Sequence, residues 1–312
     1  MRDGVSNPEL KKFDRNKLSA MANAVYRLSL AYYFSGEEKY AQKATELIRV
    51  WFIDKKTKVN PNLRFAQHVP GKADGRCYGV IDAYSYVKML DGVQLLEKSK
   101  SFTQKDSKLL KAWFSQLLKW LLTHPQAIEE SYQKNNHATA YDVQVAAYAL
   151  YTGNKKVFSD IVDNFPKRRI ATQIMPDGKQ PYELRRTLAF GYSQFNLKHI
   201  IDLMLMIKHQ GVDFRQYCVS GEHSFFKAMD FLAPYMGKSV SDWPYQQISG
   251  WEDKQQEMAK DFYRTYLLDE SRKDYLQIYR NVKMRDWRDL FVLTYEKPTK
   301  LDNAMALSLI HI

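Results

Sequence analysis

Three neighbouring residues near the middle of the chain have side chains that suit carboxylate binding. Asn135, Asn136 and His137 come directly before an apolar stretch, so two amides and an imidazole lie at an expected helix start. Backbone N–H groups also point outward at such a start. Amides donate hydrogen bonds and His titrates near neutral pH, which together suit a carboxylate ligand. The alternative is an Asn N-cap followed by an incidental His, because Asn is common at helix starts.

A second block, residues 183–196, contains Arg186 and Tyr192. Six residues on an ideal helix end about 120° short of two turns, so these side chains do not share one face. Both can reach one groove only if the helix is irregular near Gly191. The alternative is a surface Arg and a core Tyr.

Two further segments carry polar and aromatic side chains of the kind that line sugar sites. The long irregular stretch 54–79 contains the first set: Gln67, His68, Arg76 and Tyr78. In the second segment, Trp243 and Tyr245 flank Pro244 and could stack against pyranose rings. An ordinary surface loop and a packed loop are the alternatives. Long irregular stretches inside a compact domain are usually functional or disordered.

The elements that must position these residues are predicted to be helices. Apolar residues recur at spacings of three and four along residues 15–35, which is typical of a helix facing a core. Similar patterns predict further helices over 37–53, 80–97, 104–123, 138–152, 155–173, 183–209, 222–236 and 252–268. Residues 174–182 are predicted to be a turn with Asp177 and Gly178 at its tip. The segment 271–295 is mixed, and no stretch has a clear strand period.

This pattern predicts an all-α fold of antiparallel helix pairs. Such pairs can bundle, stack as a solenoid or close into a toroid, and periodicity alone does not choose among these. No linker or low-complexity segment divides the 312 residues, so we expect a single domain over 1–312.

The charge balance indicates an anionic partner. Lys and Arg total 47 against 35 Asp and Glu, a formal net charge of +12. Nucleic acid, an anionic membrane and an acidic polysaccharide all fit that charge. However, the chain has no long Lys/Arg block of the kind that follows a phosphate backbone, so no nucleic-acid partner is expected. It also has no apolar run of about 18 residues, so no membrane span is expected.

Several common catalytic motifs are absent from the sequence. It has no Gly-rich phosphate loop, no HExxH, no CxxC and no GxSxG. The seven His residues have no ligand-like spacing, so no metal site is expected. Nothing in the sequence indicates a nucleotide cofactor, so none is expected. Cys77 and Cys218 are expected to be buried thiols.

Four blocks of this sequence resemble the alginate lyase family of polysaccharide lyases. They are residues 48–82, 135–144, 176–197 and 243–245, and the resemblance spans roughly residues 1–268. It implies an (α/α) toroid, an incomplete barrel of helix hairpins around a cleft. It also implies a periplasmic or secreted enzyme. The chain shows no signal peptide and begins abruptly within family-like sequence, so we expect it to be truncated at the N-terminus.

The resemblance also implies a reaction and roles for named residues. Family members cleave uronate polymers by β-elimination: a base removes the C5 proton, the C4–O bond breaks, and a 4,5-unsaturated uronate remains. Asn136 would hydrogen-bond the carboxylate, and Arg186 would pair with it or hold the phenol of Tyr192. Tyr192 would protonate the leaving O4. His137 would be the base, or would help neutralise the carboxylate while Tyr192 serves as base and acid.

The remaining site residues are expected to bind substrate. Asn135 would be a second carboxylate donor or simply the N-cap, and the candidate subsite residues are Gln67, His68, Arg76, Trp243 and Tyr245. No metal or cofactor is needed, because donors on the protein can neutralise the carboxylate. We expect Arg186 and the positive field to lower the pKa of Tyr192. The expected substrate is alginate, first as poly-mannuronate, with glucuronan or a related uronan next.

Other functions are weighed against this one. A non-catalytic toroid that binds anionic glycans would not need Tyr192. A helical nucleic-acid or protein scaffold rests only on the charge and the helix pairs. A glycoside hydrolase usually needs two carboxylates across its cleft, and the sequence offers Glu183 without a convincing partner. The oligomeric state is not indicated.

Overall fold

The computed structural model describes residue 3 and residues 14–69, 71–282 and 290–295. Most of these residues are helical. The longer helices are α1 (Asp14–Ser35), α2 (Glu38–Ile48), α3 (Ser85–Leu95), α4 (Gln104–Thr123), α6 (Asn136–Thr152), α7 (Lys155–Phe165), α10 (Ala189–His209), α11 (Phe225–Leu232), α12 (Trp251–Leu268) and α13 (Lys273–Asn281). Among the described residues the only strands are β1 (Val219–Ser220) and β2 (His223–Ser224), which pair antiparallel.

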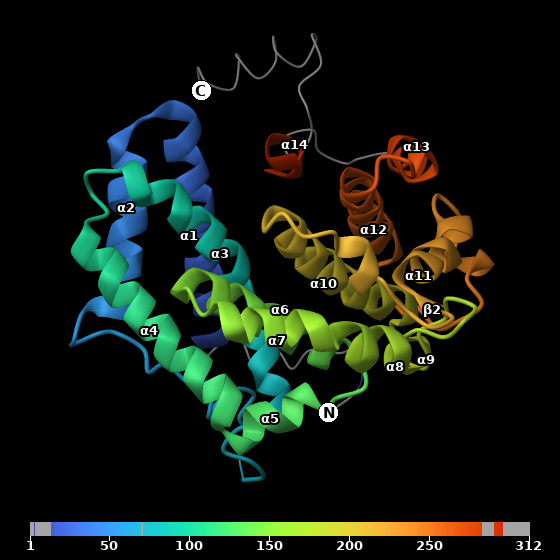
Figure 1. The fold of residues 1–312 in the computed structure, drawn as a ribbon, viewed down its shortest axis with the longest axis horizontal. Helices are drawn as coiled ribbons and strands as arrows, with labels where there is room; N and C mark the ends of the chain where they lie inside the picture. Colours follow the sequence, from blue (N-terminus) through green and yellow to red (C-terminus); the bar gives the residue numbers. More distant parts are fainter. Residues whose placement is uncertain (1–2, 4–13, 70, 283–289, 296–312) are drawn as a thin grey trace.

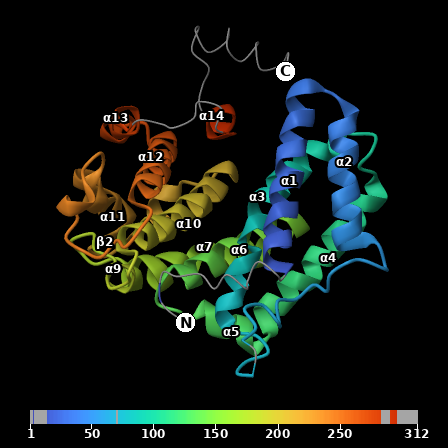
Figure 2. The ribbon, with the colours of Figure 1, turned by 180° about the vertical axis from the view of Figure 1, so that it is seen from behind.

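One row of helices follows an incomplete ring (Figures 1 and 2). In this row α1 packs on α3, α3 on α6, α6 on α10 and α10 on α12. A second set covers the row: α2 packs on α1, α4 and α7 pack on α6, and α13 packs on α12. The fold is therefore the all-α, incomplete toroid of helix hairpins that was expected.

Helix α6 lies at the middle of this row and is enclosed by its neighbours. Residues 138–149 are all buried, so the helix has no solvent-facing stripe. A helix that is surrounded in this way can be apolar on every face. It ends at Gly153, whose φ of 77° is the left-handed conformation that a glycine C-cap adopts readily. Its first turn is consequently held in a fixed place relative to the rest of the ring.

Shorter elements connect the long helices. They are the π-helical turns η2 (Arg49–Ile53) and η5 (Pro166–Ile170), the 3₁₀ segments η3 (Cys77–Tyr84), η4 (Leu96–Lys98), η6 (Phe214–Tyr217), η7 (Ala233–Tyr235) and η8 (Val240–Asp242), and the short helices α5 (Pro125–Ser131), α8 (Ala171–Gln173), α9 (Pro181–Leu184) and α14 (Leu290–Tyr295).

The loop that precedes η3 packs closely on the start of that segment. A Cβ atom added at Gly75 would lie 1.8 Å from the carbonyl oxygen of Arg64, and one at Gly79 would lie 2.5 Å from the Cβ of Ala66. Only glycine fits at these two close approaches. They fix the loop that was predicted to carry sugar-binding residues against η3.

Most predicted helices are confirmed to within a few residues. The predicted ranges 15–35, 104–123, 155–173 and 252–268 correspond closely to α1, α4, the run α7–η5–α8 and α12. The sequence pattern does not predict α5 or the β1–β2 hairpin, because seven residues and two-residue strands are too short for periodicity. The range 183–209 was predicted as one helix and is interrupted.

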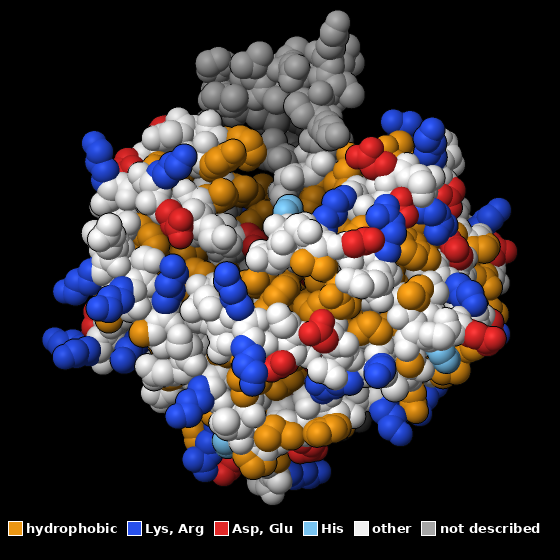
Figure 3. All heavy atoms as spheres, viewed as in Figure 1, with side chains coloured by type: hydrophobic (Ala, Val, Ile, Leu, Met, Phe, Trp, Pro, Cys, Tyr) orange, Lys and Arg blue, Asp and Glu red, His pale blue; other side chains and the backbone are white. Residues whose placement is uncertain are grey.

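The described surface carries its positive charge in scattered positions. On the face seen in Figure 3, Lys and Arg side chains are spread over the molecule and do not form one stripe. None of the helices within the described ranges is both long and apolar enough to cross a membrane.

Candidate active site

The first turn of α6 presents the predicted Asn and His residues. Asn135 is the N-cap, and its side-chain oxygen accepts a hydrogen bond from the backbone N–H of His137 at 3.3 Å. The capping alternative for Asn135 is therefore the one the structure shows. Behind it, Asn136 is buried and 1% exposed, whereas the side chain of His137 is 18% exposed. The first turn of α6 thus presents a partly exposed imidazole beside a buried amide.

A buried carboxylate on α9 holds Asn136. Glu183 Oε1 accepts from the backbone N–H of Asn136 at 2.5 Å, and Glu183 Oε2 accepts from Asn136 Nδ2 at 2.9 Å. Burial raises the pKa of Glu183, and the two hydrogen bonds from Asn136 oppose that shift. The amide nitrogen of Asn136 thus faces Glu183 and lies within hydrogen-bond distance of both of its carboxylate oxygens, at 3.1 and 2.9 Å.

A second buried carboxylate lies against His137. Glu130, at the end of α5, is fully buried, and its Oε1 lies 2.7 Å from His137 Nδ1. Burial raises the pKa of Glu130 and His137 opposes that shift. The His137 ring also makes a T-shaped contact with the Tyr78 ring, at 5.1 Å between ring centroids. The imidazole therefore has both a hydrogen-bonding and an aromatic neighbour.

Arg186 lies in a break between α9 and α10. The predicted helix 183–209 is wrong at this point: the chain leaves the helix after Leu184 and re-enters it at Ala189. The segment instead pairs with the loop 246–248, since Ala189 N–H donates to the carbonyl of Gln246 and Ile248 N–H donates to the carbonyl of Thr187. These backbone bonds replace helical ones. An irregularity near Gly191 was the condition for Arg186 and Tyr192 to reach one groove, and the break that the structure shows lies a few residues earlier.

The break brings Arg186 onto Tyr192. The guanidinium carbon of Arg186 lies 3.9 Å from the centroid of the Tyr192 ring. The same guanidinium binds the carboxylate of Asp3, with Nη2 at 2.6 Å from Oδ1 and Nε at 3.1 Å from Oδ2. Thr187 adds its backbone N–H and its hydroxyl to Asp3 Oδ2, both at 3.1 Å. Four donors thus converge on one carboxylate beside a phenol.

The pKa of Tyr192 departs from the sequence-based expectation. Burial raises this pKa above its usual range; Arg186 lowers it, and the carboxylates of Asp3 and Glu183 raise it further. The expectation that Arg186 lowers the pKa describes one contribution correctly, but the net direction is upward. Tyr192 is therefore protonated at neutral pH and suits the role of a proton donor.

The predicted loop residues Gln67 and Arg76 hold each other. Gln67 adopts a φ of 52°, unusual for a residue other than glycine. It accepts from Arg76 Nη2 at 2.8 Å and donates to the carbonyl of Tyr78 at 2.8 Å. Arg76 also lies over the Tyr78 ring, at 5.6 Å from its centroid. Both residues thereby support Tyr78 beside His137, whereas His68 is exposed and touches the carbonyl of Asp74.

A groove of about 490 Å³ joins Arg186 to the predicted aromatic pair. It is lined by Leu184, Arg185, Arg186, Trp243, Pro244, Tyr245 and Gln246. Trp243 is only 5% exposed and packs among other aromatic rings, so little of its face is available for stacking. Tyr245 is half-buried and is the more accessible ring.

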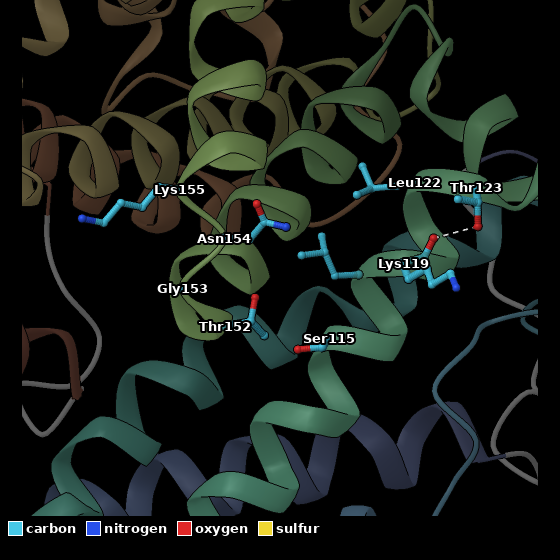
Figure 4. Close-up of a pocket in the computed structure, with 9 residues that line it drawn as sticks. Ser115, Lys119, Leu122, Thr123, Thr152, Gly153, Asn154 and Lys155 are labelled. Carbon is cyan, nitrogen blue, oxygen red and sulfur yellow. Dashed lines mark hydrogen bonds between the residues drawn. The ribbon is translucent and has the colours of Figure 1, made fainter.

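A second groove of about 580 Å³ lies between α4 and the α6–α7 connection (Figure 4). Its rim carries Lys119 and Lys155, and none of the predicted site residues lines it. Across the described ranges, no group of three His, Cys, Asp or Glu side chains is arranged to hold a metal ion.

The structure brings together the four predicted catalytic residues through Glu183. This carboxylate bonds Asn136 directly, and its charge interacts with His137, Arg186 and Tyr192. Sequence reasoning missed Glu130 and Thr187, and it considered Glu183 only as a hydrolase acid. Glu130 had one signal, since it shares the buried face of α5 with Ala127 and Ser131 at spacings of three and four.

The all-α toroid and the comparisons with known proteins together define the chain as a polysaccharide lyase. The alginate lyase family model matches residues 1–243, so the chain belongs to the alginate lyase family. The crystal structure of an alginate lyase from Bacteroides ovatus is 47% identical in sequence, with a TM-score of 0.92. The match covers 95% of this chain and 78% of that one. No curated protein sequence matches the chain.

Proposed function

We propose that this polysaccharide lyase cleaves a uronate-containing polysaccharide by β-elimination, with poly-mannuronate alginate as its first substrate and glucuronan or a related uronan as its second. The observation that carries the proposal is the carboxylate on Arg186. The guanidinium that binds Asp3 also stacks on the ring of Tyr192. A uronate carboxylate bound in place of Asp3 lies next to a proton donor. The name of the Bacteroides ovatus enzyme supports alginate.

Carboxylate neutralisation is what this reaction needs most. A C5 proton beside an ionised carboxylate leaves only if the dianion that forms is stabilised. Arg186 supplies a permanent charge, and Thr187 supplies an N–H and a hydroxyl. We also propose Asn136 as a donor to this carboxylate, for which its amide nitrogen has to be shared with Glu183.

The proton transfers fall to Tyr192 and His137. A base takes the C5 proton, the electron pair forms the C4=C5 double bond, and the C4–O4 bond breaks. Tyr192 gives its phenolic proton to O4, so one product carries a hydroxyl and the other an unsaturated uronate. In guluronate the C5 proton and O4 lie on opposite faces, which requires a base other than Tyr192, and His137 is that base. In mannuronate they share a face, so Tyr192 can serve both roles there only after it has lost its own proton: the phenolate takes the C5 proton and returns it to O4. While Tyr192 stays protonated, as its raised pKa favours, the base is His137 for mannuronate too.

The test is the ultraviolet absorbance of the conjugated unsaturated uronate. The protein is incubated in parallel with poly-mannuronate, poly-guluronate, glucuronan and pectate. A rise with one polymer supports β-elimination and identifies the substrate class. Reducing ends without a rise in absorbance would overturn the elimination mechanism, and no cleavage of any of the four would overturn the substrate proposal. We also propose that the enzyme works in the periplasm or outside the cell, where uronans are met as polymers.

A further inference from the structure

The buried carboxylate of Glu130 has one hydrogen-bond partner within the described part of the chain. Its Oε1 lies 2.7 Å from His137 Nδ1, and its Oε2 has no partner there. We propose that Glu130 is a positioning residue, which fixes the His137 ring so that Nδ1–H points to Glu130 and Nε2 faces the substrate. This inference deepens the proposed function and rests on it for the role of His137.

Burial is the first argument for this role. A fully buried carboxylate is unfavourable unless hydrogen bonds compensate its charge. Glu130 is 0% exposed, and the His137 imidazole is the one hydrogen-bond partner that it has within the described residues. A buried acid at the end of a seven-residue helix would lower the stability of the fold if it had no hydrogen-bond partner. The position is thus better explained by what it does to His137.

The surroundings prevent either partner from moving away. The residue after Glu130, Ser131, has its carbonyl oxygen held by Arg169 Nη2 at 2.8 Å, and Arg169 itself is 4% exposed. Tyr78 makes a T-shaped contact with the imidazole. A rotation of the His137 ring away from its present position would lose the 2.7 Å contact with Glu130.

Other charged or titratable groups around the pair do not replace Glu130. Those whose charges interact with His137 or Glu130 come from η3, α5, α9 and α10: Cys77, Tyr78, Asp82, Glu129, Glu183 and His199. None of these side chains hydrogen-bonds the imidazole, so Glu130 is its one hydrogen-bonding partner among the described residues.

The chemical consequence concerns which nitrogen reacts. A neutral imidazole carries one proton, and the hydrogen bond made by one nitrogen decides the state of the other. With Nδ1–H donated to Glu130, the lone pair of Nε2 is free to accept the C5 proton. The imidazolium that forms then stays paired with the Glu130 carboxylate. This is the logic by which a buried carboxylate orients a catalytic His in hydrolases of unrelated fold.

The experiment compares Glu130→Gln with Glu129→Gln. Both variants remove one negative charge from α5, but Glu129 is exposed, and its carboxylate hydrogen-bonds the Cys77 thiol and not the imidazole. We expect Glu130→Gln to lower kcat about 10²-fold, the share that a general base supplies, with KM changed less than about threefold. We expect Glu129→Gln to keep both parameters near those of the parent. Thermal unfolding of each variant shows whether it is folded.

A spectroscopic readout separates positioning from structural support. In the parent protein, the Hδ1 proton of His137 should resonate far downfield, because a hydrogen bond to a carboxylate is short and strong. This signal should be lost in Glu130→Gln and kept in Glu129→Gln. A Glu130→Gln protein with the parent's kcat, or one whose His137 signal is unchanged, would overturn the inference. The signal needs no substrate, so it tests the pair even if no uronan is cleaved and the proposed function fails.

Discussion

The side chains of Asn136 and His137, at the start of α6, are each hydrogen-bonded to a buried carboxylate. Glu183 holds Asn136, and Glu130 holds His137. These acids are not exposed to substrate, so they are not arranged as the two opposing carboxylates of a glycoside hydrolase. Their effect is to fix the direction in which an amide and an imidazole present their hydrogens and lone pairs.

Removal of the phenolic hydroxyl of Tyr192 should abolish turnover and leave binding nearly intact. Tyr192→Phe keeps the ring that stacks on Arg186 and loses only the proton donor. We expect kcat to fall by about 10²- to 10⁴-fold, the usual contribution of an acid–base group, while the Kd for a uronate oligosaccharide stays within about twofold. Absorbance assays and calorimetry measure these. A variant with normal kcat would remove Tyr192 from the mechanism.

Loss of the guanidinium of Arg186 should damage both binding and turnover. Arg186→Ala removes two donors to the carboxylate and the cation over Tyr192. We expect KM to rise and kcat to fall, each by at least about tenfold, because the group acts on the ground state and the transition state.

The matched control for that variant is the preceding residue. Arg185 has the same charge but stacks on Tyr182, at 4.8 Å from its ring centroid, and lines the rim of the groove. Arg185→Ala should therefore have a clearly smaller effect on kcat. Equal effects of the two substitutions would show that general positive charge, and not the geometry at Tyr192, matters.

Sequence reasoning found the residues whose neighbours along the chain are informative and missed those whose role depends on packing. Asn135, Asn136 and His137 form a local block at a helix start, and they were predicted together. Glu130 lies on a short helix and reads as an ordinary surface acid until α6 is packed against it. The raised pKa of Tyr192 could not be predicted from the sequence either, because it depends on burial and on the nearby Asp3, which only the folded structure brings about.

At the scale of elements, the break between α9 and α10 is what places Arg186 next to Tyr192. In a continuous helix, Arg186 and Tyr192 would lie on different faces, about 120° apart. The backbone pairing of residues 187–189 with 246–248 opens the helix and lets the Arg186 side chain fold over the Tyr192 ring. Helical periodicity could not predict this, because the partner strand-like segment is more than 50 residues away.

The anchoring of α6 by η5 and α5 can be tested through Arg169. Its Nε and Nη2 donate to the two carboxylate oxygens of Asp142 at 2.8 and 3.0 Å, and both residues are buried. Arg169→Ala leaves Asp142 charged and unpaired, so we expect the free energy of unfolding to fall by about 3–5 kcal/mol. Denaturant titration measures the loss.

Lys167→Ala provides the control for Arg169→Ala. Lys167 belongs to the same π-helical turn, η5, but is exposed. Its substitution should change the free energy of unfolding by less than about 0.5 kcal/mol. If Arg169→Ala were equally mild, the ion pair would not be what holds α6 in place.

For the whole molecule, acid stability should depend on the contact between η2 and α4. Asp106 accepts hydrogen bonds from Arg49 and Thr103, and Arg49 is the main cause that lowers its pKa to about 2. A carboxyl with a lowered pKa stabilises the fold above its unfolded pKa, about 3.9, and loses that stabilisation as the pH falls through the folded value. The contribution is therefore present at pH 5 and lost between about pH 4 and 2.

Asp106→Asn tests this dependence. We expect the variant to be less stable than the parent at pH 5 and to approach it in stability near pH 2, because the Asn cannot ionise at either pH. Free energies of unfolding at several pH values give the comparison. A difference that stays constant over this range would show that the loss of hydrogen-bond geometry, and not of charge, is responsible.

The two buried cysteines make the native protein a reporter of its own local opening. Burial raises the pKa of Cys77 to about 12 and also raises that of Cys218. The thiolate is the form of cysteine that attacks an electrophilic labelling reagent. Neither buried thiol is therefore expected to react until its surroundings open. Cys77 adjoins Tyr78 in η3, and Cys218 lies between η6 and β1. Labelling rates measured with and without a bound oligosaccharide would therefore show whether a ligand stiffens the catalytic edge alone or the whole ring.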